Sequence, residues 1–327
     1  MEQRELGNTG VRVSGLGFGC MGLVGWYGER DDDAARATLH RALDLGITHL
    51  DTAAVYQDGE NEVFVGDCIR DCRDNVFLAT KCGLNRGADG KVGADNRPET
   101  IRSSCDASLA RLGIERIDLF YLHRIDPDVP LEDSMGTLAD LVAAGKVRFV
   151  GLSEASAQTL RKAHAIYPVA ALQSELSLWT RTTARPALDT CRELGVGFVA
   201  YSPLGRGFLT GAIRSIDDLP ANDTRRLFPR FGEKNLAHNQ PLAERAAELA
   251  ARFECTPAQL ALAWVMAQWR GVLPIPGMKT LAHLSDNVGA LELEFSSSDL
   301  DFMVQSLPED EVFGERYPDG MMQAVDV

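Results

Sequence analysis

The segment Ile47–Tyr56, ITHLDTAAVY, reads as a short apolar strand that ends on an acid and is followed by a phenol on the next loop. A carboxylate at the end of a buried strand needs a cation or hydrogen-bond donors, because an unpaired buried charge is very costly. Two interpretations fit this segment alone. Asp51 caps the next helix and Tyr56 packs under a loop, or both side chains belong to a functional site, and the neighbouring strands decide between them.

On both sides of this segment, strand-like apolar runs alternate with amphipathic helical patterns. Eight such strands, each followed by a helix, fit a closed barrel better than an open sheet, and no linker-like stretch divides the chain. We therefore expect residues 1–327 to form a single α/β domain, a (β/α)8 TIM barrel. Its strands are predicted at Leu16–Met21, Ile47–Asp51, Val76–Lys81, Ile117–His123, Val147–Ser153, 169–174, Val196–Ser202 and Gly271–Ile275.

Two segments outside this alternation also carry expectations. The turn Gly7–Gly10 separates two short apolar runs and predicts an N-terminal β-hairpin that acts as a lid or plug. A long polar segment, residues 205–240, follows the seventh strand, with helices expected near 241–253 and 257–269. Loops of this length are usually functional or mobile, so we expect it to cover a bound cofactor.

Composition narrows the class of protein. Hydrophobic residues make up 45% and charged residues 24% of the 327, as in an ordinary globular protein with a large core. The net charge of −14 would repel a phosphate backbone, so nucleic acid is not expected as a partner. No signal peptide and no run long enough to cross a bilayer is seen, so we expect a cytoplasmic protein without membrane contact.

The seven cysteines are too scattered and odd in number for a disulfide framework, and we read them as reduced thiols. Cys68 and Cys72 stand four residues apart on one face of a predicted helix. Packing explains them better than zinc, since no clustered histidine or second cysteine pair accompanies them, and no metal site is expected.

Polar residues gather at the predicted C-terminal ends of the strands, where barrels of this class carry their chemistry. These residues are Asp51, Tyr56, Lys81, His123, Ser153, Glu154, Gln173, 201–207 and 276–279. A scatter of core residues would not favour this one end of every strand.

Four of these residues make chemical sense together. A tyrosine beside a buried lysine has its phenolate stabilised and its pKa lowered, and the lysine needs an acid to stay charged; this predicts a group of Tyr56, Lys81 and Asp51. His123 would orient a carbonyl oxygen or relay the proton. Singly, a lysine at a strand end is more often a snorkelling side chain and a histidine in YLH a core residue. Their occurrence on three consecutive strands favours a site that protonates the alkoxide formed when a hydride adds to a carbonyl.

These four residues, in the contexts DTA…Y, ATK and YLH, closely resemble the catalytic tetrad of the aldo-keto reductase superfamily. The resemblance extends from GLGFGCM at 15–21 to NVGAL at 287–291. It is nearest to the pyridoxal-reductase-like and Yakc-type branch, which is related to the potassium-channel β subunits. It implies that Tyr56 is the general acid, that Lys81 and Asp51 tune it, and that His123 orients the substrate.

The resemblance also implies where NADPH binds, extended across the barrel without a separate nucleotide domain. Ser153, Glu154 and Gln173 match positions that hold the carboxamide, and Tyr201 matches the ring stacked on the nicotinamide. The segment YSPLGRGFLTG at 201–211 resembles the one that wraps the pyrophosphate, and IPGMKTLAHLSDN at 275–287 the one around the adenosine. The implied contacts in these segments are Ser202, Pro203, Leu204, Gly205, Gly207, Leu209, Pro276, Gly277, Met278, Lys279, His283, Asp286 and Asn287.

Lys279 is the implied contact to the 2′-phosphate that distinguishes NADPH from NADH. Met278, Thr280 and His283 depart from the residues common in relatives and leave fewer fixed cations there. Fewer cations weaken the expected discrimination between NADPH and NADH, because that discrimination depends largely on charge-assisted bonds to the 2′-phosphate. We expect NADPH, with NADH as the alternative.

A competing nucleotide-binding signal occurs at Gly17-x-Gly19-x-x-Gly22, which matches a dinucleotide fingerprint as a string. That fingerprint must open its helix directly, whereas 23–30 separates it from the next helix. A Rossmann fold is therefore not expected.

The sequence predicts an enzyme that reduces a small-molecule aldehyde or ketone with NADPH. Two alternatives remain: a dehydrogenase that oxidises an alcohol such as pyridoxine or a sugar, and a cofactor-bound regulatory subunit like the channel β subunits. Substrate choice is expected to lie in the loops after the strands and in GERYPDGMMQAV at 314–325, with Trp26, Tyr27 and Trp179 as candidate pocket residues. The oligomeric state is not readable from the sequence.

Overall fold

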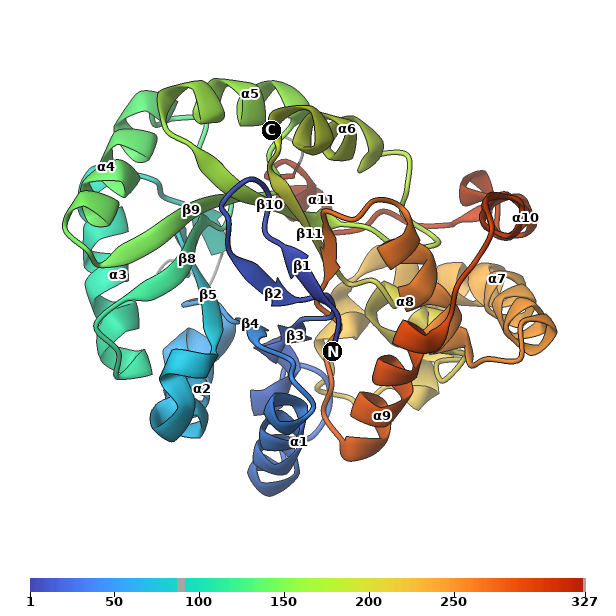
Figure 1. The fold of residues 1–327 in the computed structure, drawn as a ribbon. Helices are drawn as coiled ribbons and strands as arrows, with labels where there is room; N and C mark the ends of the chain where they lie inside the picture. Colours follow the sequence, from blue (N-terminus) through green and yellow to red (C-terminus); the bar gives the residue numbers. More distant parts are fainter. Residues whose placement is uncertain (87–91, 326–327) are drawn as a thin grey trace.

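Eight parallel strands form the centre of the molecule in the computed structural model, which describes residues 1–86 and 92–325. Their order is β12-β11-β10-β9-β8-β5-β4-β3, and helices surround them (Figure 1). Bridge pairing of Gly19 with Gly277 closes the ring between the two edge strands, as does a bond of 2.9 Å from the Gly17 N–H to the Pro274 carbonyl. The predicted (β/α)8 barrel is confirmed.

The barrel strands are β3 (Phe18–Gly19), β4 (His49–Asp51), β5 (Phe77–Cys82), β8 (Ile117–Leu122), β9 (Val147–Ser153), β10 (Val169–Glu175), β11 (Gly197–Tyr201) and β12 (Val272–Pro274). The helices are α1 (Asp32–Asp44), α2 (Glu60–Ile69), α3 (Pro98–Leu112), α4 (Leu131–Ala143), α5 (Ala157–Ile166), α6 (Arg185–Leu194), α7 (Glu233–Arg252), α8 (Pro257–Ala267), α9 (Leu281–Gly289), α10 (Ser297–Ser306) and α11 (Asp319–Met322).

Alternation of side chains along each strand divides the core into two layers. On β5, Leu78 packs outward with the core beneath the helices, whereas Phe77 and Ala79 point into the barrel interior. The same alternation on β8 turns Leu119 and Tyr121 inward. A polar residue one step further along this inward face emerges at the C-terminal end of the barrel, which we call the mouth.

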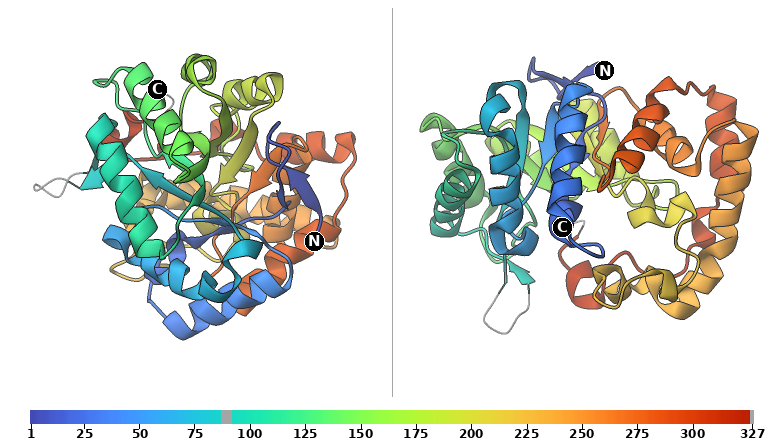
Figure 2. Two further views of the ribbon diagram at one scale, coloured as in Figure 1. Left: turned by 60° about the vertical axis from the view of Figure 1, so that its left-hand side comes forward. Right: turned by 90° about the horizontal axis from the view of Figure 1, so that it is seen from below.

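The N-terminal hairpin closes the opposite end of the barrel. Strands β1 (Gln3–Glu5) and β2 (Arg12–Ser14) pair antiparallel, and Leu6 and Val13 are completely buried among the interior side chains. Figure 2 shows the blue hairpin and the red helix α11 at opposite ends of the barrel. The hairpin is therefore a plug of the N-terminal end, and the mouth is covered by other segments.

Those covering segments depart from the sequence-based expectation. Helix α7 begins at Glu233 and continues through Pro241, whereas a helix start near residue 241 was expected. Proline usually ends a helix, but here Leu236 and Leu242 are buried on both sides of it, so packing outweighs the lost hydrogen bond. The preceding segment forms four short 3-10 helices, η4 (Gly205–Thr210), η5 (Ile216–Asp218), η6 (Thr224–Leu227) and η7 (Pro229–Phe231).

Three further elements were not predicted: helix α10, helix α11 and the small hairpin of β6 (Leu84–Arg86) and β7 (Val92–Ala94) that follows β5. Within the described part of the chain, none of the helices has the length and apolar character needed to cross a membrane.

Candidate active site

A buried ion pair between Asp51 and Lys81 lies at the mouth of the barrel; we call it the balanced pair. Strands β4 and β5 are neighbours in register, so the two side chains emerge side by side, each at most 2% exposed. The Lys81 ammonium donates to Asp51 and, at 2.8 Å, to the Thr52 carbonyl. The second carboxylate oxygen accepts from Gln173 at 2.7 Å. One cation and one anion are thus matched and fully bonded.

Tyr56 lies on the loop after β4 with its hydroxyl 3.5 Å from the Lys81 ammonium. Its ring meets that of Trp26, with centroids 5.8 Å apart, and that of His123, at 5.9 Å and nearly perpendicular. The four residues predicted to act together are therefore brought together.

The electrostatics of the phenol differ from the expectation. Burial raises the pKa of Tyr56 above its ordinary value, although the Lys81 ammonium opposes this shift. The predicted lowering of the Tyr56 pKa was wrong for the protein without a ligand. The loss of water around the phenolate outweighs the attraction of the Lys81 ammonium, whose charge Asp51 already neutralises. Burial also works against the charge of Lys81, but Asp51 more than compensates and raises the pKa of the lysine.

His123 follows the last residue of β8 and is 8% exposed. Burial lowers its pKa well below the ordinary value, and the cations Arg124 and Lys81 lower it further. Its Nδ1 atom has no hydrogen-bond partner among the described residues. The imidazole is therefore uncharged at neutral pH and has a ring nitrogen available for a ligand.

Ser153 and Gln173, which the sequence assigns to the carboxamide, adjoin the tetrad. They are paired in register on β9 and β10, and both are nearly completely buried. The Ser153 hydroxyl accepts from Arg124 at 3.3 Å, and Gln173 bonds to Asp51. A ligand bound to Ser153 and Gln173 would be connected to the balanced pair through Gln173, which donates to Asp51.

Glu154, the third residue assigned to the carboxamide, has a carboxylate that is held by partners within the protein. It accepts from the Ser174 hydroxyl and the Glu175 N–H, both at 3.0 Å, and forms an ion pair of 2.8 Å with Arg316. Its backbone is in the left-handed region, with φ of +53°. Since these bonds satisfy the carboxylate, the structure gives Glu154 an anchoring contact to the C-terminal segment.

Tyr201, the expected partner of the nicotinamide, ends β11. Its hydroxyl bonds to that of Tyr317 at 2.9 Å. Burial raises its pKa well above the ordinary value, and Glu154 and Tyr317 add to the effect. The C-terminal segment, a distant part of the chain, therefore reaches the centre of the mouth.

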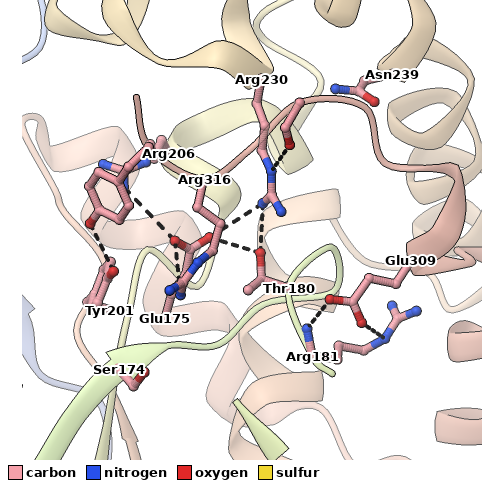
Figure 3. A network of polar contacts seen from close by, with 12 residues as sticks. Ser174, Glu175, Thr180, Arg181, Tyr201, Arg206, Arg230, Asn239, Glu309 and Arg316 are labelled. Atoms are coloured by element: carbon pink, nitrogen blue, oxygen red, sulfur yellow. Dashed lines mark hydrogen bonds and ion pairs between the residues drawn. The ribbon is translucent and has the colours of Figure 1, made fainter. Parts of the chain in front are cut away.

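A second group of buried charges surrounds Glu175 (Figure 3). Glu175 ends strand β10 and is paired in register with Tyr201 of the neighbouring strand β11. We call it the arginine cluster; it consists of Glu154, Glu175, Arg206, Arg230 and Arg316. Ion-pair distances from Glu175 are 3.6 Å to Arg230, 3.9 Å to Arg316 and 4.0 Å to Arg206. Three guanidiniums therefore share two carboxylates, and one nitrogen of Arg206 lacks a hydrogen-bond partner among the described residues.

The segment 201–211 has an unusual backbone. Ser202, Gly205, Arg206 and Gly207 all have φ between +48° and +93°. Glycine is required at 205 for a second reason, since a Cβ there would lie 2.6 Å from the Trp179 indole nitrogen. Non-glycine residues with a left-handed backbone, such as Ser202 and Arg206, are strained and concentrate at functional sites. Around them Pro203 and Leu209 are buried and Leu204 is half-buried.

The residues expected around the adenosine do not converge on one point. Lys279 donates at 2.6 Å to the carbonyls of both Tyr27 and Glu29, and burial lowers its pKa. Asp286 accepts from Thr256 at 2.7 Å. In the remainder of this stretch, Pro276, Met278 and Asn287 are buried, whereas Gly277 and His283 are exposed.

The three candidate pocket residues divide into two groups. Trp26 lies against Tyr56, and Tyr27 accepts a hydrogen bond of 3.2 Å from Arg206, so both line the mouth. Trp179 is only 3% exposed and stacks on Phe208 at 4.3 Å, so it supports the covering segment from beneath. Among the described residues no three His, Cys, Asp or Glu side chains are grouped so that they could hold a metal ion.

Sequence reasoning did not single out Arg124, Glu175 or Arg316, although Arg316 lies within the segment 314–325 that was expected to cover the pocket. Arg124 had a usable signal, since it directly follows the histidine at a strand end. Arg316 had none, because no periodic pattern connects position 316 with a strand more than 140 residues earlier, as its bond to Glu175 requires. Tyr317 was included only as part of a segment expected to cover the pocket.

Known proteins are similar to this chain in both sequence and fold. Residues 15–307 match the model of the aldo/keto reductase family. A protein named probable aldo-keto reductase 1 from Glycine max is 43% identical over 320 residues, 97% of this chain and 92% of that protein. The solved structure of a glycerol dehydrogenase from Gluconobacter oxydans superposes with a TM-score of 0.83 at 28% identity, covering 94% of this chain and 96% of that one. A thermostable aldo-keto reductase in complex with the inhibitor epalrestat gives 0.75 at 27% identity, covering 94% and 100%.

Proposed function

The chain belongs to the aldo/keto reductase family and is thus an oxidoreductase, and from this premise we propose that it reduces aldehydes and ketones with NADPH, with Tyr56 as the proton donor. The observation that carries the proposal is the position of the Lys81 ammonium, which contacts both the Asp51 carboxylate and the Tyr56 hydroxyl in a buried site. We further propose that residues 1–327 act as one barrel domain on a small-molecule carbonyl compound.

Bound NADPH supplies the hydride that reduces the carbonyl carbon. Tyr56 then gives its proton to the substrate oxygen, and the phenolate left behind is stabilised by the ammonium of Lys81. Because burial raises the pKa of Tyr56, the phenol stays protonated and ready to donate throughout the neutral range. The uncharged His123 is suited to orient the carbonyl oxygen by a hydrogen bond.

The residues present fit an extended nicotinamide dinucleotide. The left-handed residues and glycines of 201–211 suit a backbone that a phosphate can approach closely. Ser153 and Gln173 offer a hydroxyl and an amide beside the tetrad. Lys279 is the only lysine or arginine in 275–287, so we assign it the 2′-phosphate and prefer NADPH to NADH. To bind a phosphate, the Lys279 ammonium would give up its hydrogen bonds to the carbonyls of Tyr27 and Glu29.

Alcohol oxidation is the second candidate, favoured by the structural similarity to a protein named a glycerol dehydrogenase. The same groups serve that direction, because Tyr56 would take the proton that it gives in reduction. Comparing the rates of both directions at matched pH decides which one the site favours.

The test is a panel of aldehydes and ketones assayed for NADPH oxidation by the wild-type protein and by Tyr56→Phe. Removal of a positioned general acid should lower turnover by roughly 100- to 10,000-fold. The affinity for NADPH, measured by fluorescence titration, should hardly change. Turnover that survives the substitution, or a panel without any reduced carbonyl, would rule out the proposal.

A further inference from the structure

Arg124 is a buried cation next to the proposed reaction centre. It directly follows His123 and is only 7% exposed. One terminal nitrogen donates to the His123 carbonyl at 2.6 Å and to the Ser153 hydroxyl at 3.3 Å, and the other donates to the Tyr317 hydroxyl at 3.4 Å. All three acceptors are uncharged oxygens.

This set of partners distinguishes Arg124 from the other buried cations at the mouth. Lys81 is paired with Asp51, Arg316 with Glu154, and Arg230 with Glu175. No carboxylate oxygen in the described part of the chain lies within the 4.0 Å ion-pair distance of Arg124. Burial of a cation without an anion is costly, and arginine cannot lose its charge to avoid that cost.

The neighbouring carboxylates form no ion pair with Arg124 within the described residues, although the charge of Glu154 acts on it from beyond the ion-pair distance. Glu154 and Glu175 are the carboxylates of the arginine cluster, where three guanidiniums already share them. With Arg124 added, four buried guanidiniums face two carboxylates at the mouth. An anion from outside the protein would balance the charge.

The position of Arg124 indicates which ligand brings that anion. The phosphates of the proposed cofactor are assigned to 201–211 and 275–287, on the far side of the mouth from β8. Arg124 instead directly follows His123, the residue that is proposed to orient the carbonyl, and donates to the His123 carbonyl oxygen. Its contact to Tyr317 is long for an N–H···O bond, so an incoming anion would displace little.

We propose that Arg124 binds a carboxylate of the substrate, so that the preferred substrates are aldehydes or ketones that also carry a carboxylate. The planar guanidinium presents two parallel donors that match a carboxylate, a geometry that lysine lacks. Arg124 is then a specificity-determining residue. This inference rests on the proposed carbonyl reduction and adds the class of substrate.

The experiment compares substrates that differ only in charge. Terephthalaldehydic acid is paired with its methyl ester, and succinic semialdehyde with butanal, each assayed with NADPH and wild-type protein. A charge-assisted bidentate contact should raise kcat/KM for the acids by roughly 10- to 100-fold over the neutral partners, mainly through KM. Equal values within each pair for the wild-type protein would overturn the inference.

Variants locate the effect at Arg124. Arg124→Gln should lower kcat/KM for the acids roughly 10- to 100-fold more than for their neutral partners, so that the preference for the acids is lost, and Arg124→Lys should restore part of that preference. Arg102→Gln is the matched control, since Arg102 is an exposed arginine paired with Asp140 on the outer helices. An equal loss for both members of a pair in Arg124→Gln would mean that Arg124 only positions His123, and would contradict the inference.

The two proposals fail in different ways. If the wild-type protein reduces neutral aldehydes but does not prefer acids, only the carboxylate inference fails. If it reduces neither, the proposed function itself fails.

Discussion

The two groups of buried charge at the mouth differ in how they are balanced and in how the chain builds them. The balanced pair joins one carboxylate and one ammonium from adjacent strands, 30 residues apart. The arginine cluster joins two carboxylates and three guanidiniums, and Arg316 comes from a segment 162 residues after Glu154. The first group comes from the barrel itself, whereas the second ties the covering segments to the barrel.

This difference indicates which buried charged residues can be replaced with little loss of stability. Among the described residues, each partner of the balanced pair is the sole counter-charge of the other, so removal of either leaves a buried charge uncompensated. In the arginine cluster the carboxylates are scarce and the guanidiniums are in excess. Removing an anion and removing a cation there should therefore have unequal effects.

The largest effect on stability is expected for Asp51→Asn, which leaves the Lys81 ammonium buried among neutral oxygens. The free energy of unfolding should fall by about 3–5 kcal/mol. The double variant Asp51→Asn/Lys81→Met should be more stable than the single variant, because no charge remains unpaired. Urea unfolding of the wild type, Asp51→Asn, Lys81→Met and the double variant measures this, with Asp140→Asn at the surface as a control; additive losses would show that the two charges are not coupled.

Unequal responses within the arginine cluster are the next expectation. Glu175→Gln should cost about 3 kcal/mol of unfolding free energy, since three guanidiniums lose a shared anion. Arg206→Met should cost roughly 1 kcal/mol or less, because its ion pair is the longest of the cluster and one of its nitrogens is unpaired. The same unfolding measurement compares them. Equal losses would refute the excess of positive charge.

Acid pH should weaken the fold through imidazoles that stay neutral in the interior. Burial lowers the pKa of His49 to about 4 from its ordinary value of 6.5. Because the unfolded chain binds the proton and the folded protein does not, this stability is present above pH 6.5 and is lost as the pH falls toward 4. Between pH 7 and 5 the loss due to His49 should be about 2 kcal/mol.

His49→Leu should remove that part of the pH dependence, whereas exchange of the exposed His283 for Gln should not. Both ring nitrogens of His49 lack a partner among the described residues, so the leucine leaves no group unpaired. Unfolding free energies at pH 7 and pH 5 provide the measurement. The same slope in wild type and His49→Leu would exclude this origin.

The smallest expected effect concerns the choice of cofactor. Lys279→Met should weaken NADPH binding by roughly tenfold and leave NADH binding nearly unchanged, because only NADPH has the extra phosphate. Lys234→Met, on helix α7, is the control. Equal weakening of both cofactors would assign Lys279 to another part of the dinucleotide.

Local patterns in the sequence were sufficient for the barrel and for the first of the two groups. Alternation along β5 and β8 places Lys81 and His123 on the inward face, parallel register then brings Lys81 next to Asp51, and His123 lies against the ring of Tyr56. Such contacts follow from the fold once the strands are known. The resemblance to a known tetrad named the same residues.

The arginine cluster could not be predicted in this way. Arg316 and Tyr317 lie in an irregular segment without periodicity, and their partners are set by where the C-terminal segment returns over the mouth. The partners of the Glu154 carboxylate could not be predicted either, because a position at a strand end does not fix the direction of a side chain in the left-handed backbone region. Helix α7 was placed too late because local propensity at Pro241 is overridden by packing.

The most direct test of the account is a transfer experiment with NADPH in which both hydrogens at C4 of the nicotinamide are replaced by deuterium. The wild-type protein is mixed with an aldehyde such as the methyl ester of terephthalaldehydic acid, and the alcohol is analysed by mass spectrometry. The account predicts that the deuterium appears on the former carbonyl carbon, and that Tyr56→Phe forms this product far more slowly. An unlabelled alcohol, or equal rates for the two proteins, would contradict it.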